Sequence, residues 1–168
     1  PEYREKFKIK TIRSPVKLRH VSMEYVKKQK IIEYEEIVYE TSSYTFEELK
    51  QMTLYAWAFS TFQNLGIFEY FSNYYNQIHN LSFMSFYEIF FEYCKSEKSI
   101  FSKEVEIVMD HLNNGLSGKG WDHVEPEFGD INWPIDEASW LRLVPDIEMF
   151  EKESIKFLEF LENKCNFE

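Results

Sequence analysis

One short stretch of the chain gathers side chains that could do chemistry. Trp121, Asp122, His123 and Glu125 place an indole, two carboxylates and an imidazole within five residues. Such a set suits metal ligation or proton transfer, but no second cluster completes a site. The other interpretations are contact with a substrate or a neighbouring domain, and an ordinary polar loop. We predict no catalytic, cofactor-binding or metal-ligating residue in this chain. Our hypothesis is that this stretch contacts a substrate or a neighbouring domain.

The nearby glycines superficially resemble a phosphate-binding loop. Gly115, Gly118 and Gly120, with Lys119, form a G-x-x-G-x-G run. A dinucleotide fingerprint needs a strand before it and a helix that begins inside it. This run follows a predicted helix and enters irregular chain, so we do not predict a phosphate site.

The remaining histidines and the cysteines have ordinary structural interpretations. For His20, His79 and His111 we expect solvated or capping roles. Cys94 occupies an apolar helical stripe, which is typical of a buried thiol. Cys165 lies 71 positions further on, so we expect two reduced thiols and no disulfide framework.

Helical periodicity dominates the chain after Thr41. Thr45 and Glu48 form a capping box that predicts a helix beginning at Phe46, and Gly66 can take the positive φ that ends it. Ser85 and Glu88 offer a second box. Asn113, Asn114 and Gly115 supply the predicted stop of the clearest amphipathic helix. Together the stripes predict five or six helices, beginning near residues 46, 67, 83, 101, 134 and 145.

The N-terminal part has a different pattern. β-branched residues are interleaved with basic ones over residues 8–18, and β-branched and aromatic residues recur over residues 31–40, which indicates two strands. No glycine lies between them, so a tight turn is not indicated. We predict a mainly α fold, an orthogonal bundle of five or six helices with a small two-stranded β element near the N-terminus.

Composition bounds the organisation of the chain. Its 168 residues predict a single domain over 1–168, with a basic extended arm or hairpin at 1–41 and an acidic helical body at 42–168. Residues 1–33 hold ten Lys or Arg against four Asp or Glu, although the net charge is −10. The arm therefore packs on the body or binds a partner.

The same charge excludes some partners. A net negative chain repels a phosphate backbone, so we expect no nucleic-acid partner. No apolar run is long enough to span a bilayer and no signal segment is present, so we expect a cytoplasmic protein without a membrane partner.

Residues 115–133 form the longest irregular segment, and long loops in compact domains are often functional. Trp121 and Trp133 are large rings favoured at contacts. We expect the contact surface to combine this loop, through Trp121, Asp122, His123 and Trp133, with the basic arm, through Arg13, Lys17, Arg19 and His20.

Several runs resemble one family. Residues 1–11, PEYREKFKIKT, resemble the PEYR-x-K-[YF]-G-I-x-T run that follows the catalytic barrel of cobalamin (B12)-binding radical S-adenosylmethionine (radical SAM) proteins. Residues 36–48, EIVYETSSYTFEE, are similar to that family's passage from strand into helix. Residues 85–88 resemble its acidic and aromatic helix start, and residues 133–137 with the closing helix resemble its end. Lys8 stands where the family commonly has glycine.

The resemblance implies a C-terminal domain cut from a longer chain. The family's 4Fe-4S cluster, S-adenosylmethionine and cobalamin would be held by the upstream radical SAM and cobalamin-binding domains, because this sequence lacks both the C-x-x-x-C-x-x-C run and the D-x-H-x-x-G signature. The domain would cap the barrel or shape the substrate pocket of a methyltransferase or iron-sulfur oxidoreductase type of enzyme. The alternatives are a free-standing helical protein-interaction module and, last, an independent enzyme that works through residues 121–125.

Overall fold

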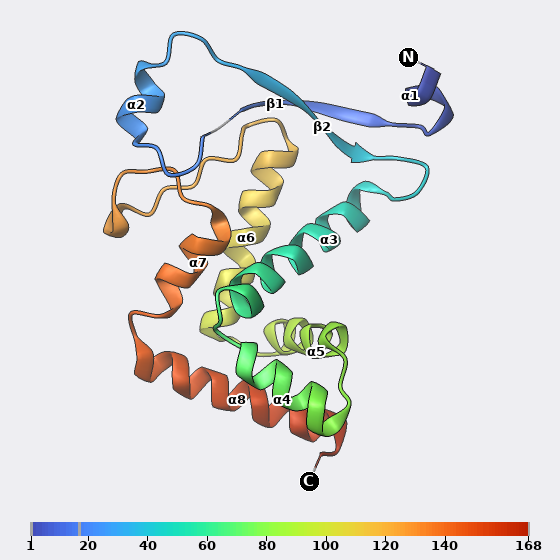
Figure 1. Ribbon diagram of the computed structural model, residues 1–168, viewed down its shortest axis with the longest axis vertical. Coiled ribbons are helices and arrows are strands. Elements are labelled where there is room, and N and C mark those ends of the chain that lie inside the picture. Colours follow the sequence, from blue (N-terminus) through green and yellow to red (C-terminus); the bar gives the residue numbers. More distant parts are fainter. Residues whose placement is uncertain (1, 17, 168) are drawn as a thin grey trace. The chain divides into compact units, whose positions relative to one another are not determined.

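The computed structural model describes residues 2–16 and 18–167. Lys17, one of the expected contact residues, lies outside the described part. The described residues form eight α-helices, a π-helical segment, a 3-10 turn and a two-stranded antiparallel sheet (Figure 1). In chain order the elements are α1 Glu2–Lys6, β1 Lys10–Pro15, α2 Met23–Lys28, β2 Tyr34–Glu40, α3 Phe46–Ala58, η1 Phe59–Asn64, α4 Glu69–His79, α5 Phe83–Ser96, α6 Ile100–Leu116, η2 Pro126–Phe128, α7 Ile135–Leu143 and α8 Ile147–Cys165.

The predicted class, mainly α with a small two-stranded sheet near the N-terminus, is confirmed. Six described α-helices follow Thr41, as expected from the periodicity. The two short helices α1 and α2 are additional. Helix α2 begins because the Ser22 side chain accepts a hydrogen bond from the Tyr25 amide. This local capping interaction lies in the connection between the two predicted strands.

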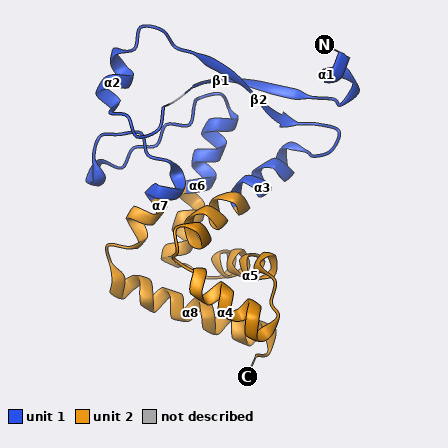
Figure 2. Cartoon of the chain, viewed as in Figure 1, with its two compact units in different colours: residues 1–54, 108–138 blue, residues 55–107, 139–168 orange. Residues whose placement is uncertain are grey.

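The described chain divides into two compact units (Figure 2). Unit 1 comprises residues 1–54 and 108–138, and unit 2 comprises residues 55–107 and 139–168. These boundaries do not coincide with the change of pattern at Thr41, because α3, α6 and α7 each contribute residues to both units. Folding as the single domain expected from the sequence stays a prediction.

Unit 2 has a core built from phenylalanine rings. Phe68 is completely buried, and its ring centroid lies 4.9 Å from that of Phe62, 5.4 Å from Phe101 and 5.5 Å from Phe157. Edge-to-face and offset contacts at these distances stabilise aromatic clusters beyond the area they bury. The high aromatic content of the sequence therefore serves helix packing here.

Helix starts show how local signals compete. The Thr45–Glu48 capping box is confirmed: the Thr45 amide donates to Glu48 Oε2 at 2.7 Å, and the Glu48 amide donates to Thr45 Oγ1 at 3.3 Å. The second predicted box is wrong. Ser82, in an extended conformation, accepts from the Ser85 amide at 3.0 Å and caps α5, so Ser85 lies in the first turn instead of before it.

The sheet of unit 1 pairs β1 with β2, with Ile12 opposite Ile37 and Ser14 opposite Glu35. The connection between the strands contains α2, in agreement with the prediction that no tight turn joins them. Ion pairs join Arg4 to Glu36 and Lys10 to Glu40. Part of the arm's positive charge is thus balanced by the arm's own carboxylates.

The end of α6 differs from the prediction. Gly115 lies inside the helix, which continues to Leu116, and the chain turns at Gly118 with φ +79°. A Cβ on Gly118 would lie 3.0 Å from the Arg13 carbonyl oxygen. This glycine therefore permits both a left-handed turn and close packing of the loop on β1.

Candidate functional site

Asn132 joins the N-terminal arm to the long loop in unit 1. It is 2% exposed and uses all its polar groups. Its amide donates to the Val21 carbonyl and its carbonyl accepts from the His20 amide, at 2.9 and 2.8 Å. Its side chain donates to the Leu18 carbonyl and accepts from the His123 amide, both at 3.0 Å. These four bonds fix residues 18–21 beside residues 123–132.

The position of Trp121 is fixed by a glycine on α6. A Cβ built on Gly115 would lie only 2.4–2.5 Å from three atoms of the Trp121 ring, so the indole packs where any other residue would place a side chain. Trp121 also meets His111 with ring centroids 5.6 Å apart. The ring is partly buried, which gives it a structural role in addition to the expected contact role.

Two histidines adjoin this tryptophan. The rings of His111 and His123 lie 5.7 Å apart at nearly a right angle, and His123 Nε2 lies 2.6 Å from Glu125 Oε1. Burial, with a smaller electrostatic contribution from His123, lowers the pKa of His111 to about 4, although Asp122 opposes the shift. His111 is therefore neutral at pH 7. The expected solvated or capping role for His111 is wrong, because the loop folds back over α6 and covers it.

The arm contributes a second pair of contacts. His20 takes a left-handed φ of +60° and places its ring 5.9 Å from that of Trp133, edge to face. Its Nε2 lies 2.7 Å from Glu137 Oε2. The backbone amide of Trp133 donates to the His123 carbonyl at 2.8 Å, so the two histidines flank one short segment of the loop.

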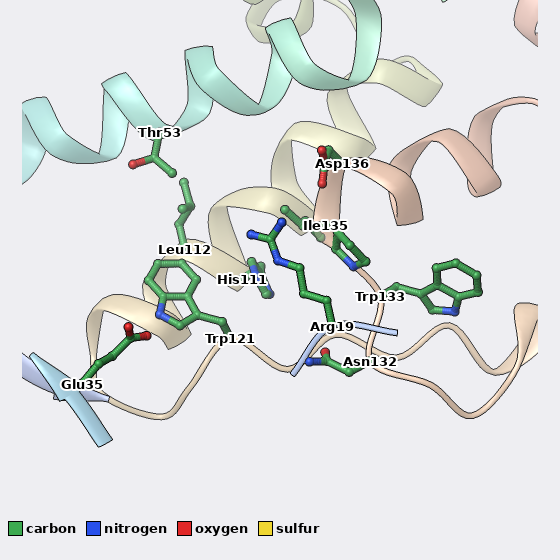
Figure 3. Close-up of a pocket in the computed structure, with 11 residues that line it drawn as sticks. Arg19, Glu35, Thr53, His111, Leu112, Trp121, Asn132, Trp133, Ile135 and Asp136 are labelled. Atoms are coloured by element: carbon green, nitrogen blue, oxygen red, sulfur yellow. The ribbon is translucent and has the colours of Figure 1, made fainter. Parts of the chain in front are cut away.

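These walls enclose a pocket of about 350 Å³ within unit 1 (Figure 3). It is lined by Arg19 and Glu35 of the arm, Thr53 of α3, His111 and Leu112 of α6, and Trp121, Asn132, Trp133, Pro134, Ile135 and Asp136 of the loop and α7. The lining residues are far apart in the sequence, from Arg19 in the arm to Asp136 in α7. Figure 3 shows the Arg19 side chain extending from the arm between the two tryptophans.

The expected contact residues are thus partly assembled. Arg19, Trp121 and Trp133 line the pocket, whereas His20 and His123 do not line it but contact the lining residues Trp133 and His111. Asp122 and Arg13 are not among the lining residues; the Arg13 guanidinium lies 4.1 Å from the centre of the Tyr34 ring.

Sequence reasoning missed three participants. Glu35 looked like one of several strand carboxylates, and His111 like a solvated helix residue. Asn132 gave no signal beyond its position next to Trp133. Only the pairing of the arm with the loop brings these residues to one pocket.

The described residues do not fit a metal or an iron-sulfur cluster. They contain no group of three or more His, Cys, Asp or Glu side chains arranged to hold an ion. Cys94 is buried and Cys165 is partly buried, and burial raises the pKa of the Cys94 thiol to about 12, far from the thiolate that a metal needs.

No protein-family model matches the chain, and no curated protein matches it. Within the described part of the chain, no helix combines the length and the apolar character that crossing a bilayer requires.

Proposed function

We propose that this chain is the accessory C-terminal domain of a B12-binding radical SAM enzyme and that its unit 1 pocket shapes the substrate site or caps the catalytic barrel. The observation that carries the proposal is the convergence of Arg19, Trp121 and Trp133, from the two segments expected to make the contact, on one pocket. The 4Fe-4S cluster, S-adenosylmethionine and cobalamin belong to the upstream domains in this proposal.

The backbone at Lys8 gives independent support. Lys8 adopts φ +50°. This left-handed conformation is unfavourable for a residue that has a Cβ atom, whereas glycine adopts it readily. The resembling family commonly has glycine at this position. The left-handed conformation at this position therefore supports the resemblance of residues 1–11 to the family, in addition to the matching residue types.

Radical chemistry gives such a pocket a task. A reactive intermediate has to be kept from water and side reactions, and the cofactors carry the chemistry while the protein supplies binding and orientation. Two indole rings, Leu112 and Ile135 give the pocket apolar walls, and Arg19 and Asn132 add polar groups. This chain would then position the substrate without itself being catalytic.

The first experiment is to sequence the coding region upstream of Pro1. We expect an in-frame C-x-x-x-C-x-x-C run. In the full-length enzyme, Arg19→Gln should reduce turnover at least about tenfold, because charge-assisted hydrogen bonds contribute about 1.5–3 kcal/mol. Lys27→Gln is the matched control, since Lys27 is exposed and does not line the pocket. A missing cysteine run, or equal turnover in both variants, would contradict the proposal.

The second candidate is a free-standing helical protein-interaction module. It is favoured by an apolar groove of about 450 Å³ in unit 2, lined by Tyr55, Ala56, Phe59, Ser60, Phe83, Met84 and Tyr87. Phe59 and Met84 are 41% and 60% exposed, and exposed apolar surface of this kind marks contact sites. If the upstream region encodes no cysteine run, this becomes the preferred function.

A further inference from the structure

The unit 1 pocket holds two opposite charges that do not pair. Arg19 and Glu35 both line it, yet neither side chain has an ion pair or hydrogen bond with another described residue. Glu35 is held on β2 opposite Ser14. Arg19 is held by the backbone bond of its neighbour His20 to Asn132. The fold thus keeps a cation and an anion apart in one cavity.

The other ionisable groups decide which ligand charges the pocket tolerates. His111 is neutral at pH 7 because burial lowers its pKa to about 4. Asp136 adds a second carboxylate, which already interacts with another group of the chain. A purely anionic ligand would meet two carboxylates, and a purely cationic one would meet Arg19. A ligand that carries both charges satisfies both free side chains.

An apolar surface lies in the same pocket as these charges. The Trp121 ring is held against Gly115 and is drawn between Glu35 and the Arg19 guanidinium in Figure 3. An ammonium group is attracted to an indole face, and an aliphatic or aromatic body packs on it. A volume of about 350 Å³ is at the small end of the range for small-molecule sites.

We propose that this pocket binds a zwitterionic small molecule of the amino-acid class, with its carboxylate on Arg19, its ammonium on Glu35 and its apolar side chain against Trp121. This rests on the proposed function only for the use of the ligand as a substrate of the parent enzyme. Recognition of the ligand is a property of this chain alone.

The test uses L-phenylalanine and two analogues that each lack one charge. Titration calorimetry of the 168-residue chain should give the tightest binding for L-phenylalanine. Phenethylamine, which lacks the carboxylate, and 3-phenylpropionate, which lacks the ammonium, should each bind at least about tenfold more weakly, the loss expected from one charge-assisted hydrogen bond.

Two variants assign each charge to its partner. Arg19→Gln should remove the preference for L-phenylalanine over phenethylamine, and Glu35→Gln should remove the preference over 3-phenylpropionate. Lys27→Gln should bind like the wild type. Both pocket residues are exposed, so circular dichroism should show unchanged folding. The inference is overturned if no probe binds saturably, if an analogue binds as tightly as L-phenylalanine, or if both variants keep wild-type selectivity.

The outcomes separate this inference from the proposed function. Loss of selectivity in Arg19→Gln with unchanged turnover of the full-length enzyme would support the ligand site and contradict the proposed function. Reduced turnover without any preference of the chain for the zwitterion would contradict the ligand site and support the proposed function.

Discussion

Asn132→Ala should separate the N-terminal arm from the loop and dismantle the unit 1 pocket. The substitution leaves the His123 amide and the Leu18 carbonyl without the partners they have at 3.0 Å. A buried polar group left unsatisfied costs about 1–3 kcal/mol. The bond to the Leu18 carbonyl is partly buried, so water can replace the lost donor only in part. The His123 amide bond is partly buried, so the combined loss of unfolding free energy is about 2–4 kcal/mol.

For a chain of this size, about 1 kcal/mol shifts the melting temperature by about 2–4 °C, so Asn132→Ala should melt about 4–16 °C below the wild type. Urea unfolding followed by circular dichroism gives the free energy. Hydrogen exchange at residues 18–23 and 121–133 reports the affected segments. Asn113→Ala is the control because Asn113 is exposed on α6, and it should change stability by less than about 0.5 kcal/mol.

Asn132→Asp refines the same test. A carboxylate can still accept from the His123 amide, but it cannot donate to the Leu18 carbonyl unless it is protonated. Its pKa should rise in the folded state, so the deficit relative to the wild type should grow as pH rises above about 4 and shrink below it. If Asn132→Ala unfolds within about 0.5 kcal/mol of the wild type with unchanged hydrogen exchange, the amide does not hold the arm to the loop.

The other predictions concern packing, protonation, thiols and cofactors. Gly115→Ala should lose about 1–2 kcal/mol in urea unfolding, because overpacking against Trp121 outweighs the gain in helix propensity; an equal loss in the Trp121→Ala background would contradict this. The folded-state pKa of His111 lies below its unfolded value of 6.5, so its contribution, about 1–2 kcal/mol after allowance for solvent, is present above pH 6.5 and is lost as pH falls toward 4. Between pH 6.5 and pH 4, His111→Gln should therefore lose less unfolding free energy than the wild type. Cys94 should react with a thiol reagent much more slowly than Cys165 in the folded chain, and equal rates would refute its burial. Anaerobic reconstitution of the chain should give neither stoichiometric iron nor a bound-corrinoid spectrum.

The sequence by itself determined the elements whose signals are local. A capping box needs only Thr45 and Glu48 on one turn, and a positive φ at Gly66 needs only the absence of a Cβ. Apolar periodicity reports the buried face of a helix whatever it packs against. These signals predicted the fold class and the six helices after Thr41. The predicted cap of α5 was wrong. Ser82 and Ser85 are both suitable capping residues, and the backbone conformation of the folded chain decides which of them caps the helix.

The tertiary structure alone decided how the pocket is built. Arg19, Trp121 and Trp133 could be expected at a contact from their types and from the loop that carries them. The roles of Asn132, Glu35 and His111 could not, because each depends on groups supplied by distant segments: carbonyls and amides for Asn132, an unpaired guanidinium for Glu35 and a covering loop for His111. A buried amide, an isolated charge and a lowered pKa are properties of an environment, and that environment exists only once the arm and the loop have met.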